Sequence, residues 1–247
     1  MNPYFSIVIP AKNEEAYLPI LLNSLANQTD KDFEVIVSDD NSTDKTSKVA
    51  SSFQDKLSNL QIISHKSCCV AKGRNLGAQK AVGEYLIFLD ADVEISPNFI
   101  TDIKNKIQKY NARILTVWYR PKNTNFIGKL TLFLFNLGME IAKHIKPLSG
   151  GACIIIKNSL FIKIKGFDET IVYCEDSDLI QRASQQKEKF YVFSKPKLYV
   201  STRRYDKEGF LLTTYKAIKA NYHILFIGPI RKPLFRYEMG GQYFRKK

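Results

Sequence analysis

The first 95 residues alternate between short apolar runs and segments of helical character, the first of which, 14–26, carries leucines at helical spacing. A run of about four to eight β-branched or aromatic residues is typical of a strand, and apolar residues at i, i+3 and i+4 are typical of a helix. Strands that alternate with helices form a mostly parallel sheet with helices on both faces. The pattern therefore predicts an α/β fold with a Rossmann-like amino-terminal half. The strands expected are 5–10, 33–38, 60–64 and 85–89, and the helices are 14–26, 44–53 and 72–81.

The regular pattern weakens after residue 95. We expect a helix over 97–110, with Ser96 as its cap and Pro97 at its first position, because proline suits the first turn of a helix. A strongly apolar segment at 125–144 predicts a helix that lies either in the core or at an interface. The other elements expected are strands at 113–119 and 152–157 and a helix at 175–185.

Carboxylates follow two of the predicted strands. Asp90 and Asp92 end the run at 85–89, and Asp39 follows the run at 33–38. Ligands of open α/β sheets bind outside the carboxyl ends of the strands. Two carboxylates separated by one residue share a face of an extended chain, and they suit a hard divalent cation that also binds substrate phosphates. The sequence predicts a metal and phosphate site at this edge of the sheet.

The net charge indicates which kind of partner the protein binds, and the cysteine spacing indicates in which cellular compartment it lies. The formal net charge is +13, which favours an anionic partner such as a nucleotide, a phospholipid surface or a nucleic acid. Cys68, Cys69, Cys153 and Cys174 show no C-x-x-C spacing, which indicates reduced thiols in a cytoplasmic protein. The amino terminus lacks the pattern of a signal peptide, and the apolar segments are shorter than the ~20 residues that span a bilayer.

Six short motifs follow one another along the chain. They are SIVIPAKNEE at 6–15, VSDDNSTDKT at 37–46, AKGRNLGAQKAVGEYLIFLDADVE at 71–94, GGACIII at 150–156, GFDE at 166–169 and YCEDSDL at 173–179. Together they resemble inverting family 2 glycosyltransferases of the GT-A fold, and the ordered set is far more specific than any one motif. The resemblance covers about residues 5–185. It implies one GT-A domain at 1–205, with a nucleotide-binding half (1–95) and an acceptor half (96–205), followed by a basic aromatic extension at 206–247.

The resemblance implies a pocket for a nucleotide-sugar donor. Its expected residues are Pro10, Ala11, Asn13, Glu14, Asp39, Arg74 and Asp90. An ionised carboxylate only accepts hydrogen bonds, so Asp39 can read the ring N–H of uracil, thymine or guanine but not adenine. Arg74, near the start of a predicted helix, suits phosphate or ribose oxygens. Asn41 or Ser42 is expected to cap the helix that follows Asp39.

The resemblance also implies a metal and a catalytic base. Asp92 and Asp90 match the D-x-D element that holds Mg²⁺ or Mn²⁺ against the donor phosphates, with Asp92 as the direct ligand; alone, D-x-D would be read as an acidic turn after a strand. Asp176 is expected to deprotonate the acceptor hydroxyl, and Glu175 is its rival. Gly150 and Gly151 would let the backbone approach the acceptor or the donor sugar, or would form a plain turn.

The predicted function is metal-dependent, inverting transfer of a sugar, with a UDP-sugar as the expected donor, to a hydroxyl acceptor in polysaccharide or glycolipid synthesis. One alternative is transfer to a polyprenyl phosphate, which needs no general base. A remote alternative is a haloacid-dehalogenase-type phosphatase, because LIFLDADVE resembles the nucleophile motif of that class. The acceptor is expected to be a glycan or a lipid-linked molecule. We expect peripheral contact with an anionic membrane, at the inner face of the cell membrane, and no nucleic-acid partner.

Overall fold

The computed structural model describes residues 2–67, 69–122, 124–235 and 240–241. Cys68 and residues 236–239 and 242–247 of the predicted extension lie outside the described residues. The strands are β1 (Phe5–Ala11), β2 (Phe33–Asp40), β3 (Leu60–His65), β4 (Tyr85–Leu89), β5 (Glu94–Ile95), β6 (Ile114–Pro121), β7 (Cys153–Lys157) and β8 (Phe190–Val200). The helices are α1 (Leu18–Ala26), α2 (Thr46–Ser51), α3 (Val70–Lys80), α4 (Phe99–Tyr110), α5 (Phe126–Ala142), α6 (Asn158–Lys163), α7 (Glu175–Gln185), α8 (Arg203–Glu208) and α9 (Phe210–Phe226).

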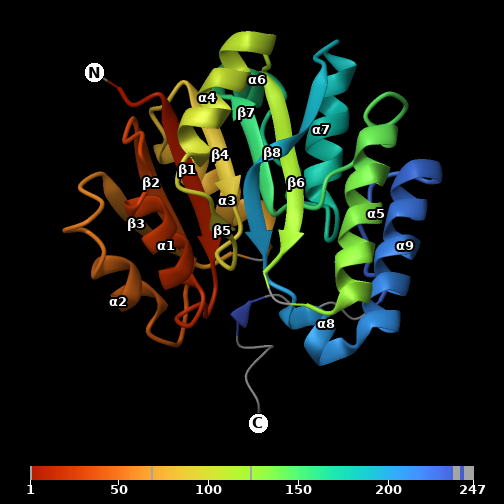
Figure 1. Cartoon of the computed structure of the whole chain (residues 1–247), viewed down its shortest axis with the longest axis horizontal. Helices are drawn as coiled ribbons and strands as arrows, with labels where there is room; N and C mark the ends of the chain where they lie inside the picture. The colour runs from red at the N-terminus through yellow and green to blue at the C-terminus, as the bar shows by residue number, and fades with distance from the viewer. Residues whose placement is uncertain (1, 68, 123, 236–239, 242–247) are drawn as a thin grey trace.

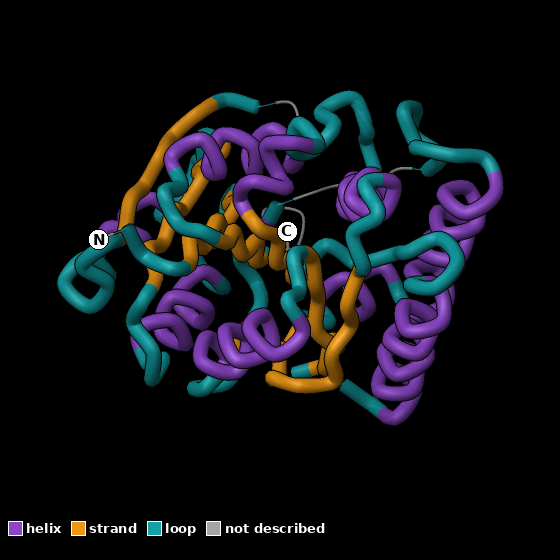
Figure 2. Tube along the Cα trace, turned by 90° about the horizontal axis from the view of Figure 1, so that it is seen from above, coloured by secondary structure: helices purple, strands orange, loops and turns teal. Residues whose placement is uncertain are grey.

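The described strands form one sheet in the order β3-β2-β1-β4-β7-β6-β8-β5. The four strands from β3 to β4 are parallel, and β6 and β8 are parallel to each other. β7 runs antiparallel to both β4 and β6, so β6 has the same direction as β4. Helices flank the strands on both sides (Figures 1 and 2). The predicted mostly parallel sheet is confirmed, and the carboxyl ends of β1, β2, β4 and β6 share one edge.

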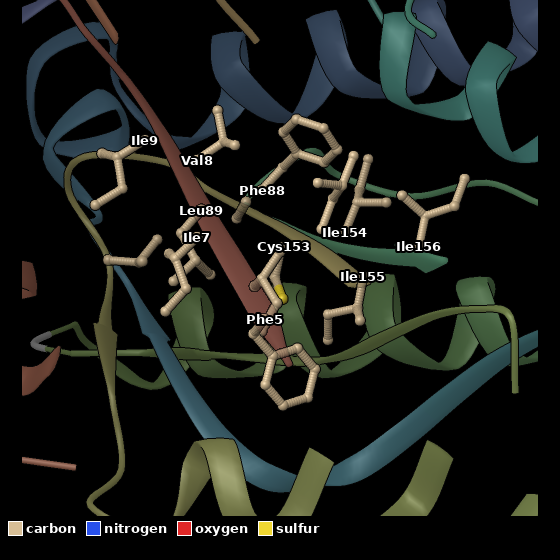
Figure 3. Packing of buried hydrophobic residues seen from close by; sticks show 14 of the residues in the cluster. Phe5, Ile7, Val8, Ile9, Phe88, Leu89, Cys153, Ile154, Ile155 and Ile156 are labelled. Atoms are coloured by element: carbon tan, nitrogen blue, oxygen red, sulfur yellow. The ribbon is translucent and has the colours of Figure 1, made fainter. Parts of the chain in front are cut away.

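The core lies along β1, β4 and β7, whose apolar side chains alternate between the two faces of the sheet. Figure 3 shows Phe88, Ile154 and Ile156 on one side and Cys153 and Ile155 on the other. All of these side chains are fully buried. Burial on both faces explains why the runs read as continuous apolar stretches in the sequence.

Two helices are placed against the core by close contacts. In α3, a Cβ added to Gly77 would lie 2.4 Å from Val8 Cγ1, so the absence of a side chain lets this helix approach β1. In α6, the ring of Phe161 lies 5.3 Å from the ring of Phe88. α1 and α4 cover the opposite face (Figure 1). α3 in this position brings Arg74 to the edge where the parallel strands end.

A side chain of α5 completes the edge of β6. β6 pairs with β7 only at Ile114 and Leu115, which leaves its later backbone groups without a strand on that side. The buried Asn136 accepts a hydrogen bond from the Tyr119 N–H at 2.9 Å and donates one to the Tyr119 carbonyl at 2.9 Å. A buried polar side chain needs such partners, and here it fastens α5 to the sheet.

Some predicted boundaries are wrong. α1 begins at Leu18 rather than at residue 14, since Tyr17 is its N-cap and proline lies in its first turn. The predicted cap at Ser96 is also wrong. Asn98 is the N-cap of α4, and the Ser96 N–H instead donates to the Lys197 carbonyl at 3.1 Å. Pro97 therefore precedes the helix.

The region after residue 187 contains β8, α8 and α9, which the sequence pattern did not reveal. Leu148, Ala220, Ile224 and Ile230 form a second apolar cluster, against which Ala142 at the end of α5 packs. Among the described helices, none combines the length and the apolar character needed to cross a bilayer. The described cysteines, Cys69, Cys153 and Cys174, are free thiols, as predicted.

Candidate active site

The loops after β1 and β2 are joined by hydrogen bonds at the edge of the sheet. Ala11 pairs with Asp39 in the parallel register, and Pro10 precedes it on β1. Asn13 has a left-handed backbone (φ 54°), and its side-chain oxygen accepts a hydrogen bond from the Thr43 N–H at 2.7 Å. Its own N–H donates to Ser42 Oγ at 2.8 Å. The first two motifs of the sequence therefore form one rigid wall of the site.

Asp39 is buried in this wall and lies at the end of β2, not after it. Its Oδ1 accepts hydrogen bonds from the Ser42 hydroxyl and from the Ser42 N–H at 3.2 Å. Within the described part of the chain, Oδ2 accepts no hydrogen bond. That oxygen is the acceptor that a base N–H could use.

The predicted cap of the following helix is wrong. α2 begins at Thr46 with Lys45 as its N-cap, so Asn41 and Ser42 lie too far before it. Asp44 takes the capping role instead, because its Oδ1 accepts the Thr46 N–H at 2.9 Å. The two earlier residues serve the loop around Asp39.

Arg74 links two acidic motifs at the centre of the site. Its Nη1 donates to Glu175 Oε1 at 2.6 Å, and its Nη2 donates to Asp90 Oδ1 at 2.8 Å. Nη2 also donates to the Gly151 carbonyl at 3.2 Å. The guanidinium is buried. Burial would lower its pKa, but the charges of Asp90 and Glu175 raise it instead, so it stays charged.

Glu175 and Asp176 occupy the first turn of α7, and both are buried. Burial is the largest cause that raises the pKa of Asp176; the charge of Glu175 adds to it and Arg74 opposes it. Glu175 is held by Arg74, whereas Asp176 faces the glycine loop. The nearby Asp178 pairs with Arg182 at 2.7 Å within the same helix, which fits a structural role.

Gly150 and Gly151 are glycines for different reasons. A Cβ at Gly150 would come within 2.7 Å of the Tyr119 ring, so the packing leaves no room for a side chain. Gly151 has φ +73°, a left-handed conformation that glycine adopts without strain. A Cβ there would lie 3.5 Å from Asp176 Oδ2 and 3.5 Å from Arg74 Nη2. The loop backbone therefore runs directly beside the expected base.

Arg203 belongs to the site, although it was not predicted. Its two terminal nitrogens donate to the two carboxylate oxygens of Glu14 at 2.7 and 2.8 Å. Its Nε lies 3.0 Å from Asp92 Oδ2, and its guanidinium lies 4.5 Å from the Tyr17 ring. Six carboxylates at one edge of the sheet need counter-cations, but the sequence contains 37 lysines and arginines, and no pattern in it indicates Arg203.

Two carboxylates beside Arg203 are hard to ionise. Burial is the largest cause that raises the pKa of Asp92 to about 6, with Arg203 opposing and Asp90 adding to the shift. Burial likewise raises the pKa of Glu14, and Arg203 again opposes it. A divalent cation at Asp92 would favour the ionised form in the same way as the arginine does.

The donor atoms fit a hard metal ion that arrives with its substrate. Among the described residues, no group of three or more histidine, cysteine, aspartate or glutamate side chains could hold a metal alone. Mg²⁺ is commonly bound through one or two carboxylates together with substrate phosphates. Asp92 and Asp90 supply two such carboxylates, so the site suits a metal that is completed by a diphosphate.

Comparison with known proteins decides the family. The family model described as glycosyl transferase family 2 matches residues 6–165, which is more than half of the chain. The chain belongs to glycosyl transferase family 2. This membership excludes the phosphatase alternative.

Individual glycosyltransferases resemble the chain in sequence and structure. Over 123 residues it is 34% identical to the poly(ribitol-phosphate) beta-N-acetylglucosaminyltransferase TarS of Staphylococcus aureus (strain Mu50), a match that covers 48% of this chain and 21% of TarS. The crystal structure of S. aureus TarS 1–349 in complex with UDP-GlcNAc matches 80% of this chain and 58% of that chain, with TM-score 0.68 and 27% identity.

A more distant structure shares the fold. The mannosyltransferase PcManGT from Pyrobaculum calidifontis, in complex with GDP-Man and Mn²⁺, matches with TM-score 0.69 and 16% identity over 89% of this chain and 65% of that chain. The predicted GT-A fold is confirmed. The chain spans about a fifth of the length of TarS (21%), so the activity of that whole protein does not transfer directly.

In this family 2 chain, the contacts bring the predicted site residues to one edge of the sheet. Gly151 lies beside both Asp176 and Arg74, and Arg74 binds Asp90. Arg203 binds both Asp92 and Glu14. The hydrogen bonds around Asn13 attach Asp39 to the same wall. The role of each residue in binding or catalysis stays a prediction, as does the division of the chain at residue 205.

Proposed function

We propose that the chain is a metal-dependent inverting glycosyltransferase that moves a sugar from a UDP-sugar to a hydroxyl acceptor. One observation carries the proposal: Arg74 binds Asp90 of D-x-D and Glu175 of the E-D pair at 2.8 and 2.6 Å, so the residues expected to serve the donor and the acceptor lie side by side. TarS, a relative that is named for N-acetylglucosamine transfer, has been crystallised with UDP-GlcNAc.

The donor is held by residues of the nucleotide-binding half of the chain. Asp39 Oδ2 accepts the ring N–H of uracil, which excludes adenine. Asp92, with Asp90 beside it, would hold Mg²⁺ or Mn²⁺. That ion, when bound, neutralises charge on the departing diphosphate as a Lewis acid. Two observations support a metal here: the carboxylate oxygens of Asp90 and Asp92 suit a hard cation, and PcManGT, which shares the fold, was solved in complex with Mn²⁺.

Asp176 acts as the general base. Its carboxylate takes the proton of the acceptor hydroxyl while the hydroxyl oxygen forms a bond to the anomeric carbon of the donor sugar. The bond from that carbon to the phosphate oxygen breaks, and the nucleoside diphosphate leaves with the bonding electrons. Attack from the face opposite the leaving group inverts the configuration. Arg74 holds Glu175 aside, which leaves Asp176 as the base.

The acceptor is a hydroxyl group of a glycan or of a lipid-linked molecule, and the reaction belongs to polysaccharide or glycolipid synthesis at the inner face of the cell membrane. The buried pair in YCEDSDL supports a hydroxyl acceptor, because a polyprenyl phosphate is already ionised and needs no base.

A panel of nucleotide sugars tests the proposal. We expect hydrolysis or transfer with a UDP-sugar that depends on Mn²⁺ or Mg²⁺ and stops with a chelator. Nuclear magnetic resonance of the product should show the anomeric configuration opposite to that of the donor. Retention, or equal turnover of adenine and uracil nucleotide sugars, would contradict the assigned mechanism or the role of Asp39.

A further inference from the structure

α5 exposes a long apolar stripe. Seven of its large apolar side chains are exposed, with Phe126 reaching 76%. These side chains are Phe126, Ile127, Leu130, Phe133, Leu134, Leu137 and Ile141. The opposite face, with Leu132, Asn136 and Met139, is buried against the domain. Contiguous exposed apolar side chains mark contact surfaces in soluble proteins, so seven of them along one helix indicate such a surface.

α9 exposes a second stripe with the same spacing. Its members are Leu211, Leu212, Tyr215, Ile218, Tyr222 and Phe226, and Leu211 is 83% exposed. Both helices have 17 residues and lie at the same end of the molecule (Figure 1). Their carboxyl-terminal ends meet, because Ala142 packs on the cluster that contains Ala220 and Ile224. Lys146 also donates to the Ile224 carbonyl at 2.7 Å.

The segments that carry the stripes have charges of almost one sign. Residues 209–235 contain no aspartate or glutamate, and residues 120–146 contain one, Glu140, which pairs with Lys143. The same two segments hold nine lysines and arginines: Arg120, Lys122, Lys129, Lys143, Lys146, Lys216, Lys219, Arg231 and Lys232. Four of these cations pair with acids, namely Lys122 with Glu94, Lys143 with Glu140, Lys216 with Glu208 and Arg231 with Asp168. The other five have no acidic partner among the described residues and leave the surroundings of the stripes positive, which is complementary to an anionic bilayer.

A cavity of about 340 Å³ opens beside the α5 stripe, between this helix and the strands β6 and β8. Its lining combines aromatic rings with cations, namely Trp118, Phe133, Tyr199, Arg120, Lys129 and Lys197. Phe133 belongs to both the stripe and the cavity. The Arg120 Nε is buried and has no hydrogen-bond partner among the described residues. Such a lining suits a phosphate group that is attached to an apolar body.

We infer that the α5 and α9 stripes lie in the surface of an anionic phospholipid bilayer and that the cavity binds the phosphate of one of its lipids. The aromatic side chains of the stripes suit the boundary between acyl chains and head groups. This lipid contact stands apart from sugar transfer, because the stripes contain none of the donor-site residues.

A second copy of the chain is the main rival occupant, and the charges oppose it. Two copies that met through these helices would bring like charges together around the contact, with Glu140 as the one acid of either segment and already paired with Lys143. Like charges across an interface disfavour association. An anionic bilayer removes this repulsion.

Flotation of the full chain with vesicles, in the absence of any donor, tests the inference. We expect the protein to float with vesicles that contain phosphatidylglycerol, not with phosphatidylcholine alone, and to be released by high salt. Leu134→Glu and Ile218→Glu place charges on exposed positions of the two stripes, so they should fold normally. Each should weaken binding at least about tenfold. Ile162→Glu is the matched control, because Ile162 is 69% exposed on α6, outside the stripes, and should bind as the unaltered chain does.

The cavity is tested by Lys197→Met, which should weaken vesicle binding about fivefold, since one lysine near an anionic surface contributes roughly 1 kcal/mol. Lys80→Met, at the end of α3, should leave vesicle binding unchanged. Failure to float with phosphatidylglycerol, or unchanged flotation of Leu134→Glu and Ile218→Glu, would overturn the inference. A dimer that these variants convert to monomers, without vesicle binding, would also overturn it and assign the stripes to self-association. UDP binding by the same variants reports separately on the donor site.

Discussion

At the scale of single residues, a substitution of Asp92 should abolish metal-dependent UDP binding while the chain still folds. Asp92→Asn keeps the size of the side chain but removes the charge that a cation needs. We expect the Mn²⁺-dependent part of UDP affinity to be lost, as measured by titration calorimetry with and without the metal. The control is Asp55→Asn on an exposed loop, which should bind UDP and Mn²⁺ as the unaltered chain does. Unchanged metal dependence in Asp92→Asn would move the ligand elsewhere.

A substitution of Asp176 should have the opposite effect, because it should keep donor binding and abolish sugar transfer. Asp176→Asn should bind UDP normally and lose transfer by about 10²- to 10⁴-fold, the usual range for a general base. Burial raises the pKa of Asp176, and only its ionised form accepts a proton. Transfer should therefore rise with pH, with a midpoint well above that of an ordinary aspartate.

Glu175→Gln distinguishes the two carboxylates. It removes the negative partner of Arg74, and it also removes a charge that raises the pKa of Asp176. We expect the midpoint of the pH–rate profile to shift downward while transfer persists. Loss of transfer in Glu175→Gln together with activity in Asp176→Asn would assign the base to Glu175.

The acidic residues of the site could be predicted from sequence because each follows a readable strand or belongs to an ordered motif. Their cationic partners could not be assigned in the same way. Arg74 was expected to meet the nucleotide, yet its terminal nitrogens are bound to Asp90, Glu175 and the Gly151 carbonyl. Arg203 lies 111 residues beyond Asp92, in a region without pattern, so only the folded chain reveals this pair.

At the scale of elements, α3 depends on glycine to reach β1. Gly77→Ala would force a Cβ to within 2.4 Å of the buried Val8 Cγ1 and should lower the free energy of unfolding by about 1 to 3 kcal/mol. Gly138 in α5 is the matched control, because a Cβ there meets nothing within 4 Å. Gly138→Ala should raise stability by about 0.5 to 1 kcal/mol through helix propensity. Denaturant unfolding measures both, and equal effects would contradict the packing of α3.

The elements of the first half were predicted to within a few residues, because buried parallel strands need uninterrupted apolar runs. β8 escaped prediction. Its sequence FYVFSKPKLYV places lysines on both sides of Pro196 and leaves several of its side chains exposed, so the apolar signal is broken. α9 escaped for a related reason, since its longest apolar stripe faces outward rather than into the core.

At the scale of the whole molecule, Arg203, the first residue of α8, binds both Glu14 and Asp92 of the amino-terminal half. Arg203→Met would leave two largely buried carboxylates without this partner and should lower the free energy of unfolding by about 2 to 4 kcal/mol. Arg204→Met is the neighbouring control. Its partner Glu208 keeps Lys216 at 2.7 Å, so the loss should stay below about 1 kcal/mol. Equal losses in the two variants would show that Arg203 does not join the parts of the chain.

The amide of Asn136 has a consequence for orientation. It holds the Tyr119 backbone at both its N–H and its carbonyl, so α5 cannot roll about its own axis without breaking two hydrogen bonds. If the exposed face of α5 rests on a flat surface, the fold fixes the angle between that surface and the sheet edge that carries the catalytic residues. The height of Asp176 over the plane should then be the same in every molecule, which restricts acceptors to those whose hydroxyl group projects that far.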